Sequence, residues 1–288
     1  MTSPLIVIVG PTASGKTGLS VDLAKQFGGE IISADSRAIY KGMDIGTAKP
    51  TMDERNGVPH WGFDLVEPGQ PFSVADFKRY ADQKIAQIRA RGNVPFLVGG
   101  TGLYVDAVVF NYQFGPQSDP TRRQELESMT LNELYKYCSK HNVNLPENDK
   151  NKRYVVRAIE QHGLKNSGDR MPASTSVIVG IATDRGILRQ RITDRTEQLF
   201  QDGVVDEATM LGEKYGWDSE AMTGNIYPLV HQHLLGSMTH EQMKEKFTTL
   251  DWRLAKRQMT WLRRNEYIVW CSLAEAREYL VGVLANEH

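Results

Sequence analysis

The fold is decided by one stretch near the N-terminus, in which Leu5-Ile-Val-Ile-Val9 runs directly into Gly10-Pro-Thr-Ala-Ser-Gly-Lys-Thr17. The first five residues are all apolar and mostly β-branched, which predicts a short strand buried on both faces, as in a parallel sheet. The next eight match the pattern G-x-x-x-x-G-K-[ST], and we expect a helix from residue 15 to about residue 27. Strand, loop and helix in this order predict a phosphate-binding P-loop. The predicted cradle comprises Gly10, Pro11, Thr12, Ala13, Ser14, Gly15, Lys16 and Thr17.

Each residue type in the predicted cradle has a chemical reason. Glycine lets the backbone turn its N–H groups inward, and the N-terminus of the following helix adds positive potential. Lys16 supplies a mobile positive charge, and Thr17 can place its hydroxyl on a magnesium ion. We therefore expect Mg2+ as the cofactor, with Thr17 as its protein ligand. The pattern is typical of nucleotide-binding and ATP-binding proteins, but it does not decide whether the bound phosphate belongs to a nucleotide.

Strands and helices alternate after the P-loop. Residues 30–33 and residues 94–98 are predicted to be further short strands of the sheet. Between them, residues 74–91 carry apolar side chains at the spacing of a helix with one buried stripe. The alternation predicts an α/β fold, with a P-loop NTPase-like three-layer core around a central parallel sheet.

The composition changes after Phe114, where Gly-Pro-Gln-Ser-Asp-Pro is turn chemistry and the next sixty or so residues have a charged, helical pattern. Strand-like runs return at residues 177–183 and 267–271, with one long helix expected over residues 186–215. We therefore predict a discontinuous α/β core interrupted by a small helical insertion domain. The expected boundaries are residues 1–114 and 176–288 for the core and residues 115–175 for the insertion.

Composition excludes several classes of protein. The chain has 288 residues, of which 40% are hydrophobic and 24% charged, as in ordinary globular proteins. Its two cysteines, Cys138 and Cys271, are too few for a disulfide framework or a zinc cluster. No apolar run is long enough to cross a bilayer, so we expect a cytoplasmic protein without membrane contact. The net charge of -1 gives no global indication of a nucleic-acid partner, but it does not exclude a local basic patch.

Asp35 is the acidic side chain nearest the predicted cradle. ATPases and GTPases usually end a strand with a magnesium-binding aspartate, but the strand here ends in Leu97-Val-Gly-Gly-Thr101, without a carboxylate. Asp35 follows the second strand instead, at the sheet edge where ligands of α/β proteins collect. It is therefore placed to act as a base facing the phosphate, unless it only makes a hydrogen bond within its own turn.

Several stretches carry a resemblance that extends over nearly the whole chain. Together they closely resemble the tRNA dimethylallyltransferases, also called tRNA isopentenyltransferases or IPP transferases. Residues 43–50 are not shared by P-loop enzymes in general. The matching stretches are residues 10–17, Ser33-Ala-Asp-Ser36, Tyr40-Lys-Gly-Met-Asp-Ile-Gly-Thr-Ala-Lys-Pro50, Phe72-Ser-Val-Ala-Asp-Phe77, Val98-Gly-Gly-Thr-Gly-Leu-Tyr104 and Leu254-Ala-Lys-Arg-Gln-Met-Thr-Trp261.

The resemblance implies a reaction. Family members transfer a dimethylallyl group from dimethylallyl pyrophosphate to N6 of the adenosine just 3′ of the anticodon, giving N6-isopentenyladenosine. The cradle would then hold the leaving pyrophosphate, so no apparatus for ATP hydrolysis is needed. By the same resemblance, Asp35 would accept the N6 proton, and Thr101 would make a hydrogen bond near the reacting atoms.

The resemblance also implies a partner, the anticodon stem-loop of tRNA, which the helical insertion domain would contact. We expect the protein to be a monomer. Four departures from the family pattern bear on tRNA affinity: Ala38 replaces a common glutamine, Tyr154 and Trp252 replace common basic residues, and Pro228 interrupts a basic segment. The residues expected to contact tRNA are Asp35, Ser36, Arg37, Ala38, Thr101, Arg123, Arg153, Tyr154, Arg157 and Arg257.

Two other functions are compatible with the residues. A small-molecule P-loop kinase would use Asp35 to activate a hydroxyl group and would release ADP from ATP. A tRNA-binding relative without catalytic activity would bind tRNA but leave its adenosine unmodified.

Overall fold

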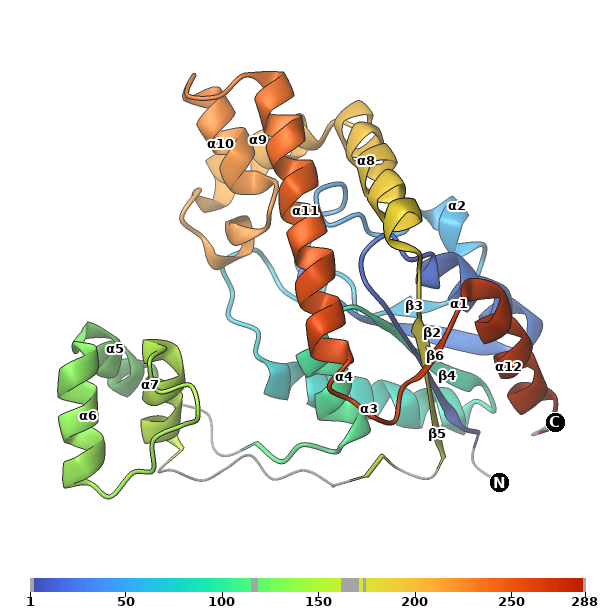
Figure 1. The fold of residues 1–288 in the computed structure, drawn as a ribbon, viewed down its shortest axis with the longest axis horizontal. Helices are drawn as coiled ribbons and strands as arrows, with labels where there is room; N and C mark the ends of the chain where they lie inside the picture. Colours follow the sequence, from blue (N-terminus) through green and yellow to red (C-terminus); the bar gives the residue numbers. More distant parts are fainter. Residues whose placement is uncertain (1–2, 115–118, 162–170, 173–174, 287–288) are drawn as a thin grey trace. The chain divides into compact units, whose positions relative to one another are not determined.

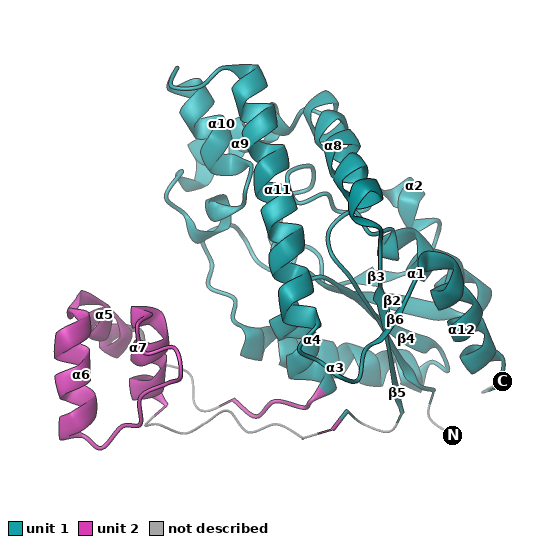
Figure 2. Cartoon of the chain, viewed as in Figure 1, with its two compact units in different colours: residues 1–109, 172–288 teal, residues 110–171 magenta. Residues whose placement is uncertain are grey.

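The computed structural model describes residues 3–114, 119–161, 171–172 and 175–286. The chain divides into two compact units, shown in Figure 2: Met1–Val109 with Pro172–His288 forms unit 1, and Phe110–Met171 forms unit 2. Both boundaries lie a few residues earlier in the chain than the sequence suggested. The strands of the described residues belong to unit 1.

Unit 1 is built on a parallel six-stranded sheet with the strand order β3-β2-β4-β1-β5-β6. The predicted α/β class with a central parallel sheet is therefore confirmed. All five residues of the first strand are buried, as their uniform apolar character requires. The strands are β1 (Leu5–Val9), β2 (Gly29–Ala34), β3 (His60–Trp61), β4 (Val94–Gly99), β5 (Ser176–Ile181) and β6 (Val269–Cys271).

Helices cover both faces of the sheet (Figure 1). On one face, α1 (Lys16–Gln26) and α12 (Leu273–Ala285) pack together over a cluster that includes Ile6, Ile8 and Phe96. On the other, α3 (Val74–Ala90) and α4 (Gly102–Val109) pack against each other and against the sheet. This arrangement is the predicted three-layer core.

A helical group follows β5 and lies over the same unit. It contains α8 (Arg185–Gln201), α9 (Val204–Tyr215), the short η1 (Glu220–Thr223), α10 (Tyr227–Leu234) and the long α11 (His240–Leu262). Figure 1 shows α11 running beside α8. The prediction of one helix over residues 186–215 was wrong, because Gly203 adopts a left-handed conformation with φ of 92° and separates α8 from α9. The short helix α2 (Met52–Arg55) was not predicted.

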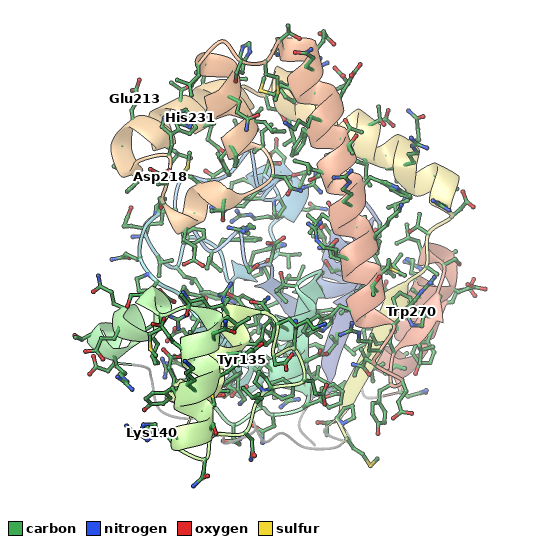
Figure 3. The ribbon with its side chains drawn as sticks, turned by 60° about the vertical axis from the view of Figure 1, so that its left-hand side comes forward. Tyr135, Lys140, Glu213, Asp218, His231 and Trp270 are labelled. Carbon is green, nitrogen blue, oxygen red and sulfur yellow. The ribbon has the colours of Figure 1, made fainter. Side chains whose placement is uncertain are left out.

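The described residues of unit 2 form three helices, α5 (Pro120–Ser128), α6 (Leu131–Lys140) and α7 (Lys152–Glu160). They enclose a small core of their own that includes Leu126, Leu134 and Val155. Tyr135 and Lys140 lie on α6 (Figure 3), and the Tyr135 hydroxyl donates to the carbonyl oxygen of Asp149 at 2.9 Å. Unit 2 therefore has the hydrophobic contacts of a separately packed helical unit.

Candidate active site at the carboxyl edge of the sheet

Two glycines of the cradle, which comprises residues 10–17, leave little room for a side chain. Gly15 has φ of 89°, and a Cβ atom there would lie 2.8 Å from Leu273 Cδ1. A Cβ atom at Gly10 would lie 2.8 Å from the hydroxyl oxygen of Ser14. The helix α1 begins at Lys16, so the loop passes directly into a helix N-terminus. This geometry favours a bound anion.

A cavity of about 340 Å³ opens over the cradle, lined by residues 13–17 and by two arginines of α8. Two polar atoms are buried there without a hydrogen-bond partner among the described residues: the Ser14 hydroxyl oxygen and Arg195 Nε. An unsatisfied buried polar group costs about 1–3 kcal/mol, so this pair favours a ligand that supplies polar atoms. Phosphate oxygens would accept a hydrogen bond from Arg195 Nε and another from the Ser14 hydroxyl.

Three positive side chains border this cavity: Lys16, Arg191 and Arg195. Arg195 Nη1 donates to Thr12 Oγ1 at 2.6 Å, and Arg191 Nη1 donates to the carbonyl oxygen of Ser14 at 3.3 Å. Burial and the neighbouring Arg195 charge lower the pKa of Lys16 to about 8, while Asp35 acts in the opposite direction. An anion in the cavity would favour the charged form of Lys16.

Asp35 and Thr101 follow the neighbouring strands β2 and β4, which end together because Ala34 pairs with Gly99. One carboxylate oxygen of Asp35 accepts from the Arg37 backbone N–H at 2.8 Å, and Thr101 Oγ1 accepts from the Ser36 N–H at 3.1 Å. Asp35 lies close enough to Lys16 for its charge to affect that ammonium. The structure therefore brings both predicted catalytic residues to the edge of the sheet that carries the cradle.

Three glycines at and just after the end of β4 allow close packing around this edge. A Cβ atom would lie 2.2 Å from the Ala34 carbonyl oxygen at Gly99, 2.4 Å from Gln258 Nε2 at Gly100, and 2.0 Å from Trp261 Cδ1 at Gly102. Gln258 also accepts from the Thr12 backbone N–H at 2.8 Å. The stretch Gly99-Gly-Thr-Gly102 is therefore explained by the close approach of β2 and α11.

Residues 43–50 have a structural role. The Glu207 carboxylate accepts hydrogen bonds from three successive backbone N–H groups, those of residues 44–46, at 2.8, 2.6 and 2.9 Å. Lys49 is buried and donates to the carbonyl oxygen of Tyr40 at 2.7 Å. These contacts fix the chain that runs on from Asp35. Glu207 was not predicted, because its partner loop lies about 160 residues away in the sequence.

The predicted tRNA contacts in unit 1 differ in their accessibility. Ala38 is only 3% exposed, so its methyl group lies in the core, and a contact of this residue with tRNA would have to be made by its backbone. Arg37 Nη1 donates to Thr223 Oγ1 at 3.1 Å, which turns the guanidinium toward η1. Ser36 is partly exposed, and Arg257 is exposed on α11.

The predicted contacts in unit 2 also differ from one another. Arg157 pairs with Glu160 at 3.3 Å, and Arg123 pairs with Glu127 at 2.9 Å and with Glu160 at 3.6 Å. Arg153 is exposed and has no ion pair among the described residues, and Tyr154 beside it is 48% exposed. Of the three arginines, Arg153 is therefore the most available to a phosphate.

Comparison with known proteins identifies the family. The family model described as IPP transferase matches residues 38–265, and one described as isopentenyl transferase matches residues 3–60. The chain belongs to the IPP transferase family. A tRNA dimethylallyltransferase from Desulforudis audaxviator is 41% identical, with 99% of this chain and 98% of that protein covered. Its counterpart in Bacillus licheniformis is 38% identical, with 93% and 90% covered.

The solved structures agree with this assignment. The crystal structure of the full-length tRNA isopentenylpyrophosphate transferase from Bacillus halodurans is 37% identical, has a TM-score of 0.76, and is covered over 97% of its chain and 99% of this one. The resemblance inferred from the sequence motifs, and with it the P-loop NTPase-like fold, is confirmed. Family membership supports an enzyme of the prenyltransferase class and supports neither the kinase nor the inactive relative.

Three of the four departures from the family pattern, Ala38, Pro228 and Trp252, lie on unit 1. Trp252 lines a second cavity, of about 390 Å³, together with Lys256 and Arg263 of α11. The Thr183 hydroxyl, which belongs to the same lining, is buried without a partner in the described part of the chain. Pro228 is exposed in the first turn of α10, where it contributes no charge.

The described residues contain no cluster of three or more His, Cys, Asp or Glu side chains that could hold a metal ion. Thr17 is exposed in the first turn of α1 and lines the first cavity. Its hydroxyl would be a suitable ligand for Mg2+ if phosphate oxygens supplied further ligands, because Mg2+ is commonly held together with substrate phosphates. No helix among the described residues is long and apolar enough to span a membrane.

Proposed function

We propose that this enzyme transfers a dimethylallyl group from dimethylallyl pyrophosphate to N6 of the adenosine just 3′ of the anticodon in tRNA. The observation that carries the proposal is the pairing of an anion cradle with a carboxylate. Lys16 and Arg195 border a cavity with unsatisfied polar atoms, and Asp35 lies near enough to influence Lys16. This pairing fits a reaction in which an anion leaves on one side while a proton is removed on the other.

In the proposed reaction, a bond forms between adenine N6 and C1 of the donor, and the bond between C1 and the pyrophosphate oxygen breaks. The exocyclic amine is a weak nucleophile because its lone pair is delocalised into the ring, so Asp35 accepts the N6 proton as attack proceeds. Lys16, Arg191 and Arg195 stabilise the negative charge that collects on the pyrophosphate. Thr101, with its hydroxyl held beside Ser36, orients the acceptor side of the site.

Mg2+ bound by Thr17 and the phosphate oxygens would supply further positive charge to the leaving group. The substrate base is stacked in an anticodon loop, so it must turn out of the stack to reach Asp35. Exposed basic side chains of each unit, Arg257 on α11 and Arg153 on α7, are suited to hold the RNA backbone while it does so. We also propose that the enzyme acts as a monomer in the cytoplasm.

The experiment is an incubation of purified protein with unmodified tRNA, Mg2+ and dimethylallyl pyrophosphate, followed by mass analysis of the nucleosides. We expect one new nucleoside, heavier than adenosine by a five-carbon unit, and none when donor or protein is omitted. A tRNA with guanosine in place of the target adenosine is the matched control and should stay unmodified. An isolated anticodon stem-loop tests whether that part of tRNA suffices. Unmodified adenosine under all conditions, with tRNA binding intact, would refute the proposal.

A further inference from the structure

Gln258 is an amide side chain of α11 whose oxygen and nitrogen face different parts of the active site. Its Oε1 atom accepts from the Thr12 backbone N–H at 2.8 Å. A backbone N–H can only donate, so the amide atom that faces the cradle must be the oxygen. The amide nitrogen faces the end of β4 instead, where a Cβ atom at Gly100 would lie 2.4 Å from Nε2. The side chain therefore lies between the cradle and the residue that precedes Thr101.

The amide nitrogen lies where the two substrates of the proposed reaction have to meet. The neighbouring strands β1 and β4 end together, with Val9 opposite Gly99, and they are followed by the cradle and by Thr101. The cradle would hold the pyrophosphate of the donor, and Thr101 lies on the acceptor side. The bond that breaks, between C1 and the pyrophosphate oxygen, must therefore lie between these two groups. Gln258 Nε2, beside Gly100, is next to that position.

The amide nitrogen is also a donor that the protein itself does not use. It carries two N–H groups, and neither makes a hydrogen bond with a residue that the structure describes. Gln258 is partly exposed, and its nitrogen is not fully buried. A fixed N–H group of this kind can stabilise negative charge that develops on a substrate.

The helix is anchored on both sides of Gln258. Ala255, about one turn earlier, is buried in a cluster against which Ala13 of the cradle packs. Trp261, about one turn later, donates through Nε1 to a carboxylate oxygen of Asp106 at 2.7 Å. A group on a helix that is held in this way needs little reorganisation when the substrate binds.

We propose that Gln258 is a further catalytic residue, whose Nε2 donates a hydrogen bond to the donor oxygen that leaves C1. The proposal rests on the proposed function of the cradle as the pyrophosphate site. As the bond between C1 and this oxygen breaks, its electron pair stays on the oxygen, while the N6 proton passes to Asp35. The amide keeps its own protons and stabilises the new charge. In the intact donor the same oxygen is an uncharged ester oxygen, so the hydrogen bond strengthens as the reaction proceeds.

The test compares two ligands, dimethylallyl pyrophosphate and inorganic pyrophosphate, each with Mg2+ in titration calorimetry. The oxygen that Gln258 would contact is charged in pyrophosphate and uncharged in the donor. Methionine is as long as glutamine but has no N–H group. We expect Gln258→Met to weaken pyrophosphate binding about tenfold and donor binding less than about threefold, because hydrogen bonds to charged groups are the stronger ones. Equal losses for both ligands would mean that Gln258 only shapes the cradle through Thr12, and would overturn the proposal.

The rate of transfer gives a second readout. At saturating donor and tRNA, the single-turnover rate of Gln258→Met should fall about 100-fold, as when one donor to a developing negative charge is removed. Gln258→Glu keeps an oxygen for the Thr12 N–H but has no amide donor, so its rate should fall at least as far. A wild-type rate in Gln258→Glu would overturn the proposal.

Gln242→Met is the matched control. Gln242 lies in the first turn of the same helix, and its Oε1 atom also accepts from a backbone N–H, that of Thr239, at 3.0 Å. The substitution should leave both affinities and the transfer rate unchanged. Losses as large as those of Gln258→Met would contradict a specific role of Gln258.

Gly100→Ala tests the same nitrogen without removing it, and it serves if Gln258→Met folds poorly. The new methyl group would lie 2.4 Å from Nε2 and 3.1 Å from the Gly10 carbonyl oxygen, so the amide, as the movable group, has to shift. We expect a slower transfer and a larger loss of affinity for pyrophosphate than for the donor. Wild-type values for Gly100→Ala would overturn the proposal. A wild-type protein that binds neither ligand would instead refute the proposed function of the cradle, whatever the variants do.

Discussion

The positive side chains at the cradle of unit 1 and the ion-paired arginines of unit 2 differ in whether a carboxylate neutralises their charge. Lys16 and Arg195 make hydrogen bonds to neutral oxygens, those of Pro11 and Thr12, and neither forms an ion pair within the described residues. In unit 2, Arg157 is paired with a carboxylate. Positive charge that is not already neutralised is available to a ligand. The comparison therefore predicts that the cradle binds a small anion strongly, while the paired arginines Arg123 and Arg157 contribute little to binding RNA.

The difference predicts a hierarchy of mutational effects. A buried, low-dielectric site makes each electrostatic contact strong, whereas exposed charges are screened by salt and cost little to lose. Substitutions of Asp35 or Lys16 should therefore change rates and affinities by orders of magnitude. Substitutions on the exposed helices of unit 2 should change tRNA affinity by small factors.

The largest effect is expected for Asp35→Asn. Asparagine keeps the size of the side chain and the oxygen that accepts from the Arg37 N–H, but it cannot take a proton. Turnover should fall by roughly 10² to 10⁴, the usual contribution of a positioned general base, with much smaller changes in donor and tRNA affinity. The measurement is single-turnover transfer at saturating donor and tRNA, paired with equilibrium binding of each.

Two outcomes would show that Asp35 does not act as the general base. A rate within about threefold of wild type would mean that the carboxylate is not the base. A loss of tRNA affinity equal to the loss of rate would instead make it a residue that binds the flipped adenine. Ser36→Ala is a useful neighbour for comparison, because it keeps the backbone N–H that donates to Thr101 Oγ1.

Lys16→Ala is expected to weaken donor binding by about one to two decades, because a charged hydrogen bond contributes roughly 1.5–3 kcal/mol. The lowered pKa of Lys16, about 8, adds a test by pH. Bound pyrophosphate favours the charged ammonium, so wild-type donor affinity should fall as the pH rises through about 8, and the Lys16→Ala protein should lack that fall. Donor titrations from neutral to alkaline pH check both points, and a parallel decline in the two proteins would show that Lys16 does not contact the donor.

Much of the cradle and the position of Asp35 could be predicted from the sequence, because both depend on residues that are near one another in the chain. The strand β1, the turn at Gly10 and Gly15, and the start of α1 follow from local apolar character and from the spacing of the motif. Asp35 was identified because parallel strands end at one edge of the sheet. These features need no knowledge of distant parts of the chain.

The residues that complete the site were not predicted, because they come from far along the chain. Arg195 and Gln258 reach the cradle only through the packing of α8 and α11, and no local pattern indicates which face of either helix turns inward. The arginines at positions 191 and 195 are spaced by one helical turn, a weak signal that also fits an exposed helix face. In unit 2, the pairing of Arg157 with Glu160 follows from their spacing of three residues on α7, but the approach of Arg123 from α5 to the same carboxylate does not follow from the sequence.

A smaller effect is expected for Arg153→Glu, which reverses an exposed and unpaired charge. Each phosphate contact that is lost should flatten the dependence of log affinity on log salt concentration by about one unit. We expect tRNA affinity to fall by about tenfold or less at moderate salt, with donor affinity unchanged. Arg157→Glu should have a weaker effect, because Glu160 already neutralises part of its charge. If neither variant alters the salt slope, both arginines lie on a face that tRNA does not touch.

The smallest effect, and the only increase in affinity, is expected for Glu160→Gln. The Glu160 side chain is 2% exposed and holds Arg123 at 3.6 Å and Arg157 at 3.3 Å, while its Oε1 atom is buried without a partner among the described residues. Glutamine keeps the size but removes the negative charge, which leaves both guanidinium groups more attractive to phosphate. We expect tRNA to bind about two- to fivefold more tightly, with a steeper salt slope. Filter binding across a salt series checks this, with Glu127→Gln as the control because Glu127 pairs with Arg123 alone. Weaker tRNA binding by Glu160→Gln would mean that the carboxylate orients the two arginines toward RNA instead of competing with RNA for their charge.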